Sequence, residues 1–358
     1  MDDIRIQQFN EQARRLGMLT IRIPPHYQRL VREEVETLGR TDGPLYRVVY
    51  PTAGRTDSKA DHDVPDFVED RTNMPSGLES LLIHKYHNRA LFLVTDVCAG
   101  HCMYCFRQDV LTDLHARELQ APEKRLDAVI AYLKDHPQVT EVILSGGDPL
   151  SVPFRHLERI MSRLDTETAV RDIRIHTRNI VFSPKVMSER VCELIGRYRV
   201  RLYLHLIHPY EIAEPVVKGI TRLKFYGVRL YSQFPILRGI NDRCEVLERL
   251  IRMMDDLGIT PVNLFVPDPI NYSAPFRIPM KRLFSLMDNL YWRTSSWNNS
   301  AHLVLDTPIG KVRREDIADW DEGNGLIIFR REGKTVTYHD FPGESDIPGD
   351  LETLLWKG

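Results

Sequence analysis

The sequence lacks long apolar runs and an excess of either charge. No stretch approaches the 18 consecutive apolar residues that a membrane span requires, and the start MDDIRIQQFN has no basic segment followed by an apolar one, as a signal peptide would have. The formal net charge of −2 gives no electrostatic support for a nucleic-acid partner. We therefore expect a soluble, cytoplasmic protein that binds neither membranes nor nucleic acid.

Cysteines are few, and their number excludes a full disulfide framework. There are five in 358 residues, an odd count, and Cys98, Cys102 and Cys105 fall within the segment TDVCAGHCMYCFR. This cluster predicts an intracellular metal site, because a reducing compartment keeps thiols available as ligands. Three thiolates can hold three irons of a [4Fe-4S] cluster and leave the fourth iron open. A zinc site that uses His101 as a fourth ligand is the alternative.

From about residue 90 onward, strand-like and helix-like segments alternate. This alternation predicts an α/β fold with a parallel sheet, and six such units could curl into a partial (β/α)6 TIM-like barrel. Chemistry in such barrels occurs in the loops after the carboxyl ends of the strands. The expected strands are 90–95, 141–144, 172–176, 199–206, 228–234 and 262–266, and the expected helices are 124–133, 154–164, 186–198, 215–226 and 243–257.

Changes in pattern divide the chain into three parts. Residues 1–80 combine helical periodicity with a polar connecting arm, and residues 81–300 carry the predicted barrel. Residues 301–358 form a strand-rich C-terminal segment, in which Gly333 lies between two strand-like stretches and predicts a hairpin. The sequence therefore predicts one barrel with extensions at both ends.

A second motif, SGGDP, occupies residues 145–149 at the end of the second expected strand. After Ser145, Gly146 and Gly147 lack side chains and allow the backbone to approach a ligand closely, and Asp148 offers a carboxylate as acceptor. Alone, the motif is typical of an ordinary turn. Its position one strand–helix unit after the cysteine segment favours ligand binding.

With these motifs, the chain resembles the lysine 2,3-aminomutase family of radical S-adenosylmethionine enzymes. The segments KYHNRALFLVTDVCAGHCMYCFR, LSGGDPL, LHLIHP, LRGIND and LDTPIGK have family counterparts in the same order, over about residues 82–342. The resemblance implies a partial (β/α)6 barrel that holds a [4Fe-4S] cluster, S-adenosylmethionine and pyridoxal 5′-phosphate together. It also implies an isomerase that moves an α-amino group to the β-carbon of an amino acid.

The resemblance assigns cofactor-binding roles to single residues. Lys311 matches the lysine that forms a Schiff base with pyridoxal phosphate, which also makes it the expected catalytic residue. Arg89 matches the arginine that binds the cofactor's phosphate, and Tyr86 could add a hydroxyl to the same group. His205 and Gln233 match positions that contact S-adenosylmethionine.

The resemblance also indicates where S-adenosylmethionine and the substrate bind. The turn at 145–149 matches the one that binds the amino group of S-adenosylmethionine, and Arg107 matches the arginine that pairs with the substrate α-carboxylate. Asp268 and Asp306 match the pair that holds the side-chain ammonium of lysine. Because paired acids in a closed pocket need a cation, we expect a basic substrate: lysine first, then ornithine or arginine.

The chain departs from the family pattern in two places. The loop before Lys311 is short. No cysteine follows Cys244, so the C-terminal zinc site of the long family members cannot form. Cys192 is expected in the core.

Two other roles stay open: a lysine aminomutase acting in elongation factor P modification, and a lyase, decarboxylase or deaminase with the same cofactors. A non-enzymatic metal-binding module is the third alternative. The resemblance further implies a flavodoxin or ferredoxin as electron donor and a homo-oligomer, a dimer or a tetramer.

Overall fold

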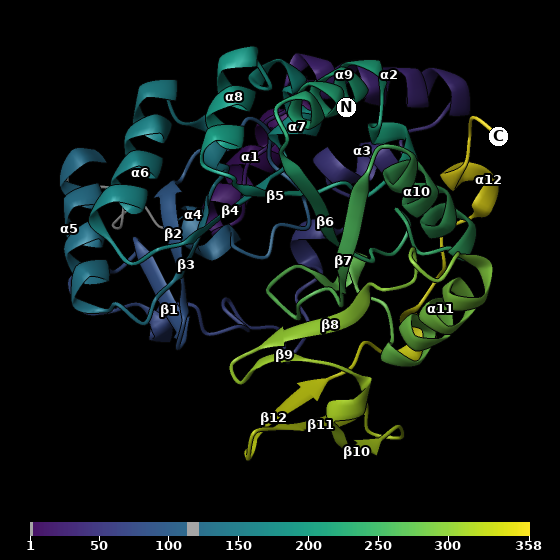
Figure 1. The fold of residues 1–358 in the computed structure, drawn as a ribbon. Helices are drawn as coiled ribbons and strands as arrows, with labels where there is room; N and C mark the ends of the chain where they lie inside the picture. The colour runs from purple at the N-terminus through teal and green to yellow at the C-terminus, as the bar shows by residue number, and fades with distance from the viewer. Residues whose placement is uncertain (1–2, 113–121) are drawn as a thin grey trace.

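A nine-stranded sheet that curls into a nearly closed barrel dominates the computed structural model, which describes residues 3–112 and 122–358 (Figure 1). The strands lie in sequence order, and β2 to β8 pair in parallel. The edge strands β1 and β9 pair antiparallel with their neighbours. The bounds are β1 (Leu82–Tyr86), β2 (Arg89–Thr95), β3 (Glu141–Gly146), β4 (Asp172–Thr177), β5 (Arg201–Leu204), β6 (Arg229–Pro235), β7 (Ile259–Phe265), β8 (His302–Thr307) and β9 (Gly310–Val312).

Helices cover the outside of this sheet, and they form where the sequence has apolar residues at helical spacing. In α8, for example, the buried positions Val191, Cys192, Leu194 and Ile195 all face the core, which confirms the expectation for Cys192. The helices are α4 (Gln108–Thr112), α5 (Pro122–Asp135), α6 (Phe154–Glu167), α7 (Asn179–Phe182), α8 (Glu189–Arg197), α9 (Glu214–Phe225), α10 (Cys244–Asp256) and α11 (Met280–Arg293). The predicted α/β fold with a partial barrel is confirmed.

Three N-terminal helices precede the barrel: α1 (Asp3–Arg15), α2 (Pro25–Leu38) and α3 (Pro44–Val49). Of these three helices, α2 packs on α7. Tyr27 of α2 is fully buried, packs edge-on against Phe182, and donates a hydrogen bond to Glu211 across 2.8 Å. The N-terminal region is thus fixed to the barrel rather than separate from it.

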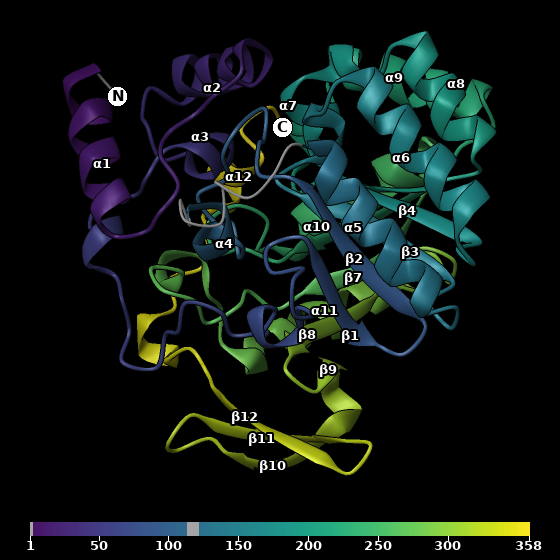
Figure 2. The same ribbon diagram turned by 90° about the vertical axis from the view of Figure 1, so that its left-hand side faces the viewer.

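Two groups of strands follow residue 300. β8 and β9 belong to the barrel sheet, whereas β10 (Ile317–Asp321), β11 (Leu326–Arg331) and β12 (Lys334–His339) form a separate three-stranded sheet (Figure 2). The turn between β11 and β12 consists of Glu332 and Gly333, both with positive φ, so the hairpin predicted at Gly333 is confirmed. A short helix, α12 (Leu351–Leu354), ends the fold. Within the described residues, no helix is long and apolar enough to cross a membrane.

Candidate active site

The cysteine loop directly follows β2, and the N-terminal arm holds it in place. The backbone N–H of Met103 donates to the carbonyl of Val48 across 2.7 Å, and that of His101 donates to the carbonyl of Arg22 across 2.9 Å. The imidazole Nδ1 of His101 lies 2.7 Å from the carbonyl oxygen of Thr20, so this side chain faces the arm. The loop conformation therefore depends on residues some 55 to 80 positions earlier in the chain.

The three thiols of Cys98, Cys102 and Cys105 are free and only partly exposed. Burial raises the pKa of each, to about 12 for Cys105, and the guanidinium of Arg178 acts in the opposite direction on Cys102. Among the described residues, no three His, Cys, Asp or Glu side chains converge to hold one metal ion, whereas the thiolates of an iron–sulfur cluster bind separate irons. Three cysteines on one loop beside a buried cation suit a cluster whose ligands carry negative charge.

The glycines of the SGGDP turn bring the end of β3 against the cysteine loop. Gly146 has a φ of +122°, and a Cβ there would lie 2.1 Å from the carbonyl oxygen of Thr95. A Cβ on Gly147 would lie 2.5 Å from the carbonyl oxygen of Val97. The backbone N–H of Gly147 donates to the Thr95 carbonyl across 2.7 Å. The close approach that the sequence indicated is therefore made, in this structure, to the backbone of the cysteine loop.

Asp148 fixes the turn that follows these glycines. Its buried carboxylate accepts hydrogen bonds from the hydroxyl of Thr177 and from the backbone N–H groups of Leu150, Arg178 and Asn179, at 2.7 to 3.0 Å. These donors come from the turn itself and from the end of β4. Asp148 thus joins two neighbouring strand ends, while its predicted contact with S-adenosylmethionine stays a prediction.

Polar side chains from the middle strands lie near one another at the site. Tyr104 of the cysteine loop lies 3.1 Å from Nε2 of His205, which follows β5, and the two rings stack. On β6, Nε2 of Gln233 lies 3.1 Å from Nδ1 of His176 on β4. The other ring nitrogen of His176 is buried and, among the described residues, has no hydrogen-bond partner. Burial lowers the pKa of His176, and nearby positive charges, including Arg107, lower it further.

Arg107 is held from two sides. Its Nε donates to Asp70 of the N-terminal arm across 3.1 Å, and its Nη1 donates to the hydroxyl of Ser145 across 3.0 Å. Both side chains of the Arg107–Asp70 pair are largely buried, at 13% and 11% exposure. A guanidinium fixed in this way can present its remaining N–H groups to a carboxylate. The sequence singled out Arg107 and Ser145 but gave no sign of Asp70, which precedes Arg107 by 37 positions.

The expected cofactor lysine lies on the edge hairpin of the barrel. Pro308 and Ile309 form the turn between β8 and β9, so Asp306 and Lys311 are directly opposite each other in the antiparallel pair. Cross-strand partners share one face of a sheet, and the Lys311 ammonium donates to the Asp306 carboxylate. The short loop before Lys311 therefore places these two side chains where they can form the ion pair.

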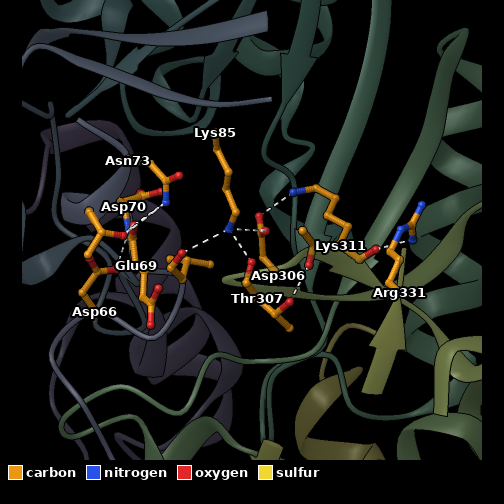
Figure 3. Close-up of polar contacts among 12 residues, drawn as sticks. Asp66, Glu69, Asp70, Asn73, Lys85, Asp306, Thr307, Lys311 and Arg331 are labelled. Atoms are coloured by element: carbon orange, nitrogen blue, oxygen red, sulfur yellow. Dashed lines mark hydrogen bonds and ion pairs between the residues drawn. The ribbon is translucent and has the colours of Figure 1, made fainter. Parts of the chain in front are cut away.

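Side chains of β1 reach across the gap between the two edges of the sheet, which we call the barrel seam. Lys85, only 9% exposed, donates to the carbonyls of Thr307 and of Val68, and its Nζ lies 4.0 Å from Asp306 (Figure 3). Figure 3 shows Lys85 and Lys311 approaching Asp306 from two sides. These contacts join β1, the arm and β8 at the seam between the two edge strands of the described sheet, β1 and β9.

The residues expected to bind phosphate lie at the same seam. The guanidinium of Arg89 lies 4.1 Å above the ring of Tyr86, its partner in the turn between β1 and β2. The hydroxyl of Tyr86 lies 3.6 Å from where a Cβ on Gly310 would be, and Gly310 has a φ of +103°. Glycine at this position therefore gives both the turn geometry and room for Tyr86 next to Lys311.

Charges at the seam are tightly coupled. Burial and the neighbouring carboxylate of Asp306 raise the pKa of Asp268 to about 8. Burial alone would raise the pKa of Asp306, but Lys311 and Lys85 outweigh it and lower that pKa. Burial alone would lower the pKa of Lys311, yet Asp306 and other negative groups outweigh it and raise that pKa. The structure thus brings the two predicted substrate acids together with the predicted cofactor lysine.

Five further residues make contacts at the site that sequence reasoning missed. Asp70 and Lys85 fix Arg107 and Asp306; the sequence placed Lys85 beside Tyr86 without assigning it a contact. Arg178 forms a buried ion pair with Glu211 next to the cysteine loop. Arg331 of β11 donates to the carbonyl of Lys311 across 2.6 Å. All of these contacts link distant parts of the chain, and no local motif announces them.

Comparison with known proteins agrees with this geometry. A model of the Radical SAM superfamily matches residues 92–254, so the fold and the cysteine loop define a radical S-adenosylmethionine enzyme. L-lysine 2,3-aminomutase of Escherichia coli (strain K12) is 30% identical over 261 residues, which cover 72% of this chain and 74% of that protein. A putative L-lysine 2,3-aminomutase of Aquifex aeolicus is 28% identical over 92% of this chain and 84% of that one. The corresponding enzyme of Clostridium subterminale is 28% identical over 90% of this chain and 75% of that one.

The chain therefore belongs to the lysine 2,3-aminomutase family. It is an enzyme, an isomerase of the aminomutase class, and it acts on a small molecule with S-adenosylmethionine and a [4Fe-4S] cluster. The loop that carries Cys98, Cys102 and Cys105 begins and ends inside the matched region.

Proposed function

We propose that this enzyme converts a basic L-α-amino acid, lysine first, into its β-amino isomer, with pyridoxal 5′-phosphate held by Lys311. The observation that supports the proposal is the seam itself, where Asp268 and Asp306 lie beside Lys311 on facing segments. An acidic substrate side chain would be repelled there, whereas a cation would be attracted.

The balance of charge around Lys311 supports a cationic substrate. Three carboxylates, Asp70, Asp268 and Asp306, share this region with the cations Lys85, Lys311 and Arg107. When Lys311 holds the cofactor, Asp306 loses its hydrogen-bonded partner and keeps only Lys85, 4.0 Å away, and buried carboxylates with too little compensating charge are costly. The ammonium group of lysine or ornithine, or the guanidinium of arginine, restores that partner.

The residues present fit the cofactors that the proposal needs. Cys98, Cys102 and Cys105 would hold the cluster, Lys311 would hold pyridoxal phosphate, and Arg89 with Tyr86 would face its phosphate. When bound, these groups together supply a carbon radical and a means of stabilising it while nitrogen migrates. The protein's own part is to bind the substrate, orient it and exclude water.

Substrate orientation follows from the two fixed ends of the site. Arg107, held by Asp70 and Ser145, offers its free N–H groups to the α-carboxylate of the substrate. Asp306, joined by Asp268 once that carboxyl is ionised, attracts the far cationic end. A substrate bound at both ends leaves little freedom at its α- and β-carbons, which lowers the entropy cost of reaction.

Other parts of the proposal depend on family resemblance. The reductant would be a flavodoxin or ferredoxin, the protein would act in the cytoplasm, and it would form a dimer or tetramer. Modification of elongation factor P by the lysine product is a downstream role that the same activity would serve.

The test is an anaerobic assay of the reconstituted enzyme with dithionite, S-adenosylmethionine and pyridoxal phosphate. Lysine, ornithine, arginine, glutamate and alanine are offered together, and isomers are identified by mass spectrometry. We expect a β-amino isomer of lysine, or else of ornithine or arginine. Turnover of glutamate or alanine alone would contradict the assignment of Asp268 and Asp306, and loss of ammonia or carbon dioxide would indicate a different reaction type.

A further inference from the structure

A polar cavity lies at the opposite end of the barrel from the cysteine loop. Its volume is about 280 Å³, and its lining comes from α6, α8, the start of β4 and the segments that precede β4 and β5. The elements α6, α8 and β4 lie together in Figure 2. Its polar lining consists of Asp165, Arg171, Arg197, Tyr198 and Arg199. Arg171 and Arg199 precede parallel strands, so the cavity opens at their amino ends, whereas the cysteine loop follows a carboxyl end.

Positive charge dominates this cavity. The lining has three arginines and one aspartate, and Arg197 forms an ion pair with Glu193 at 3.1 Å. Among the residues that the structure describes, Arg171 and Arg199 form no ion pair. The exposed guanidinium groups of the cavity outnumber its single carboxylate, so with the phenol of Tyr198 they make a set of donors with a net attraction for an anion.

The backbone at Arg199 is unusual, and two neighbouring loops show why. Each of α8, α9 and α10 ends in the same way before the next strand, with a left-handed residue that follows the C-terminal cap. That residue is Gly227 after α9 and Gly258 after α10, both with φ near +70°, but it is Arg199 after α8, with a φ of +51°.

The loops that follow α8 and α9 are almost identical in sequence and in hydrogen bonding. Residues 198–201 read YRVR and residues 226–229 read YGVR. In both, the left-handed residue donates to the carbonyl three positions earlier, and the next residue donates to the carbonyl five positions earlier. Glycine is the residue that this conformation favours, so arginine carries a conformational cost. The one loop that bears this cost is the one that lines the cavity.

We propose that this cavity is a binding site for a phosphoryl group, separate from the active site, in which Arg171 and Arg199 are the main ligands. Guanidinium groups bind phosphate oxygens in pairs of hydrogen bonds, and the volume suits a phosphate or diphosphate rather than an extended molecule. The phosphoryl group can come from an inorganic phosphate or from a nucleotide whose base lies outside the cavity.

The test uses the anaerobically reconstituted enzyme and isothermal titration calorimetry at constant ionic strength. Inorganic phosphate, pyrophosphate and ADP are titrated separately into the wild type and into Arg199→Gly. The variant removes a cavity ligand and also relieves the left-handed strain, so it is expected to fold at least as stably as the wild type. Arg229→Ala is the matched control, because it removes the same charge at the equivalent strand start, outside the cavity.

We expect pyrophosphate or ADP to bind the wild type and Arg229→Ala equally, and to bind Arg199→Gly at least about tenfold more weakly. The comparison between variants separates this cavity from any phosphate site in the barrel. Binding of pyrophosphate and ADP alike would identify the phosphoryl group as the recognised part, and binding of ADP alone would identify a nucleotide. Equal affinity of Arg199→Gly and the wild type, or no saturable binding of any of the three, would overturn the proposal.

Discussion

The cysteine loop and the barrel seam are built in different ways, although both belong to one site. The cysteine loop takes all three predicted metal ligands from eight consecutive residues after one strand. The seam takes its charged groups from the arm, β1, the end of β7, and β8–β9, which are separated by more than 200 positions. Ligands that lie on one loop can be predicted from their spacing in the sequence. Charged groups that come from distant segments are brought together only when the barrel closes.

Because the two parts are built differently, we expect a substitution in one part to abolish its own function and to leave the function of the other part intact. The largest effect is expected at the cysteine loop. Replacing Cys102 with alanine should remove cluster iron and reduce cleavage of S-adenosylmethionine by more than about a thousandfold, because a thiolate ligand has no substitute there. Iron and sulfide analysis with a cleavage assay measures this. Cys244→Ala is the control and should keep both.

At the seam, replacing Lys311 with alanine should abolish amino acid isomerisation while reductive cleavage of S-adenosylmethionine continues. The expected loss is also more than about a thousandfold, since the lysine would carry the cofactor. Parallel assays of cleavage and isomerisation measure the separation. Lys334→Ala, at an exposed position on β12, should lose neither. If Lys311→Ala lost cleavage as completely as Cys102→Ala, the two parts would not be separable.

A pH profile tests the charge at the seam. With a pKa of about 8, Asp268 is protonated below that pH in the free enzyme and has no charge to attract a cation. The value of kcat/KM for lysine should therefore rise with pH, by up to about tenfold per unit from pH 6 towards 8. Asp268→Asn should have low activity and lose this rise. An unchanged profile in the variant would mean that another group titrates.

The smallest effect is expected where the arm meets the barrel. Asp70→Asn removes the charge that fixes Nε of Arg107, so the KM for lysine should increase by about tenfold with little change in kcat. Lysinamide, which lacks the α-carboxylate, should show no such increase. Asp70→Glu should restore part of the affinity. An equal increase for lysine and lysinamide would indicate a general structural role for Asp70.

Sequence reasoning reached the fold and the local motifs but not the contacts between distant segments. The six expected strands correspond to β2 to β7, because alternating apolar runs report burial directly. The same reasoning placed β8 in a C-terminal segment, although it pairs with β7 in the barrel. The roles of Asp70 and Arg178 depend on where the arm and the ends of β4 and β5 meet, which no local pattern encodes.

The short loop before Lys311 shows how a structure can clarify a departure from the family pattern. In the sequence, this loop only has fewer residues than the family pattern has before the lysine. In the fold, the two-residue turn of Pro308 and Ile309 makes Asp306 and Lys311 direct cross-strand partners, so the loop length determines which acid faces the lysine. Lys85 then reaches the same acid from β1.

Lys311, rather than its neighbour Lys85, is expected to carry pyridoxal phosphate at the seam. The most direct measurement is reduction of the cofactor-loaded enzyme with borohydride, followed by proteolysis and mass spectrometry of the peptides. We expect the cofactor's mass on the peptide that contains Lys311, and its loss in Lys311→Ala. Labelling of Lys85, or of no lysine at the seam, would contradict it.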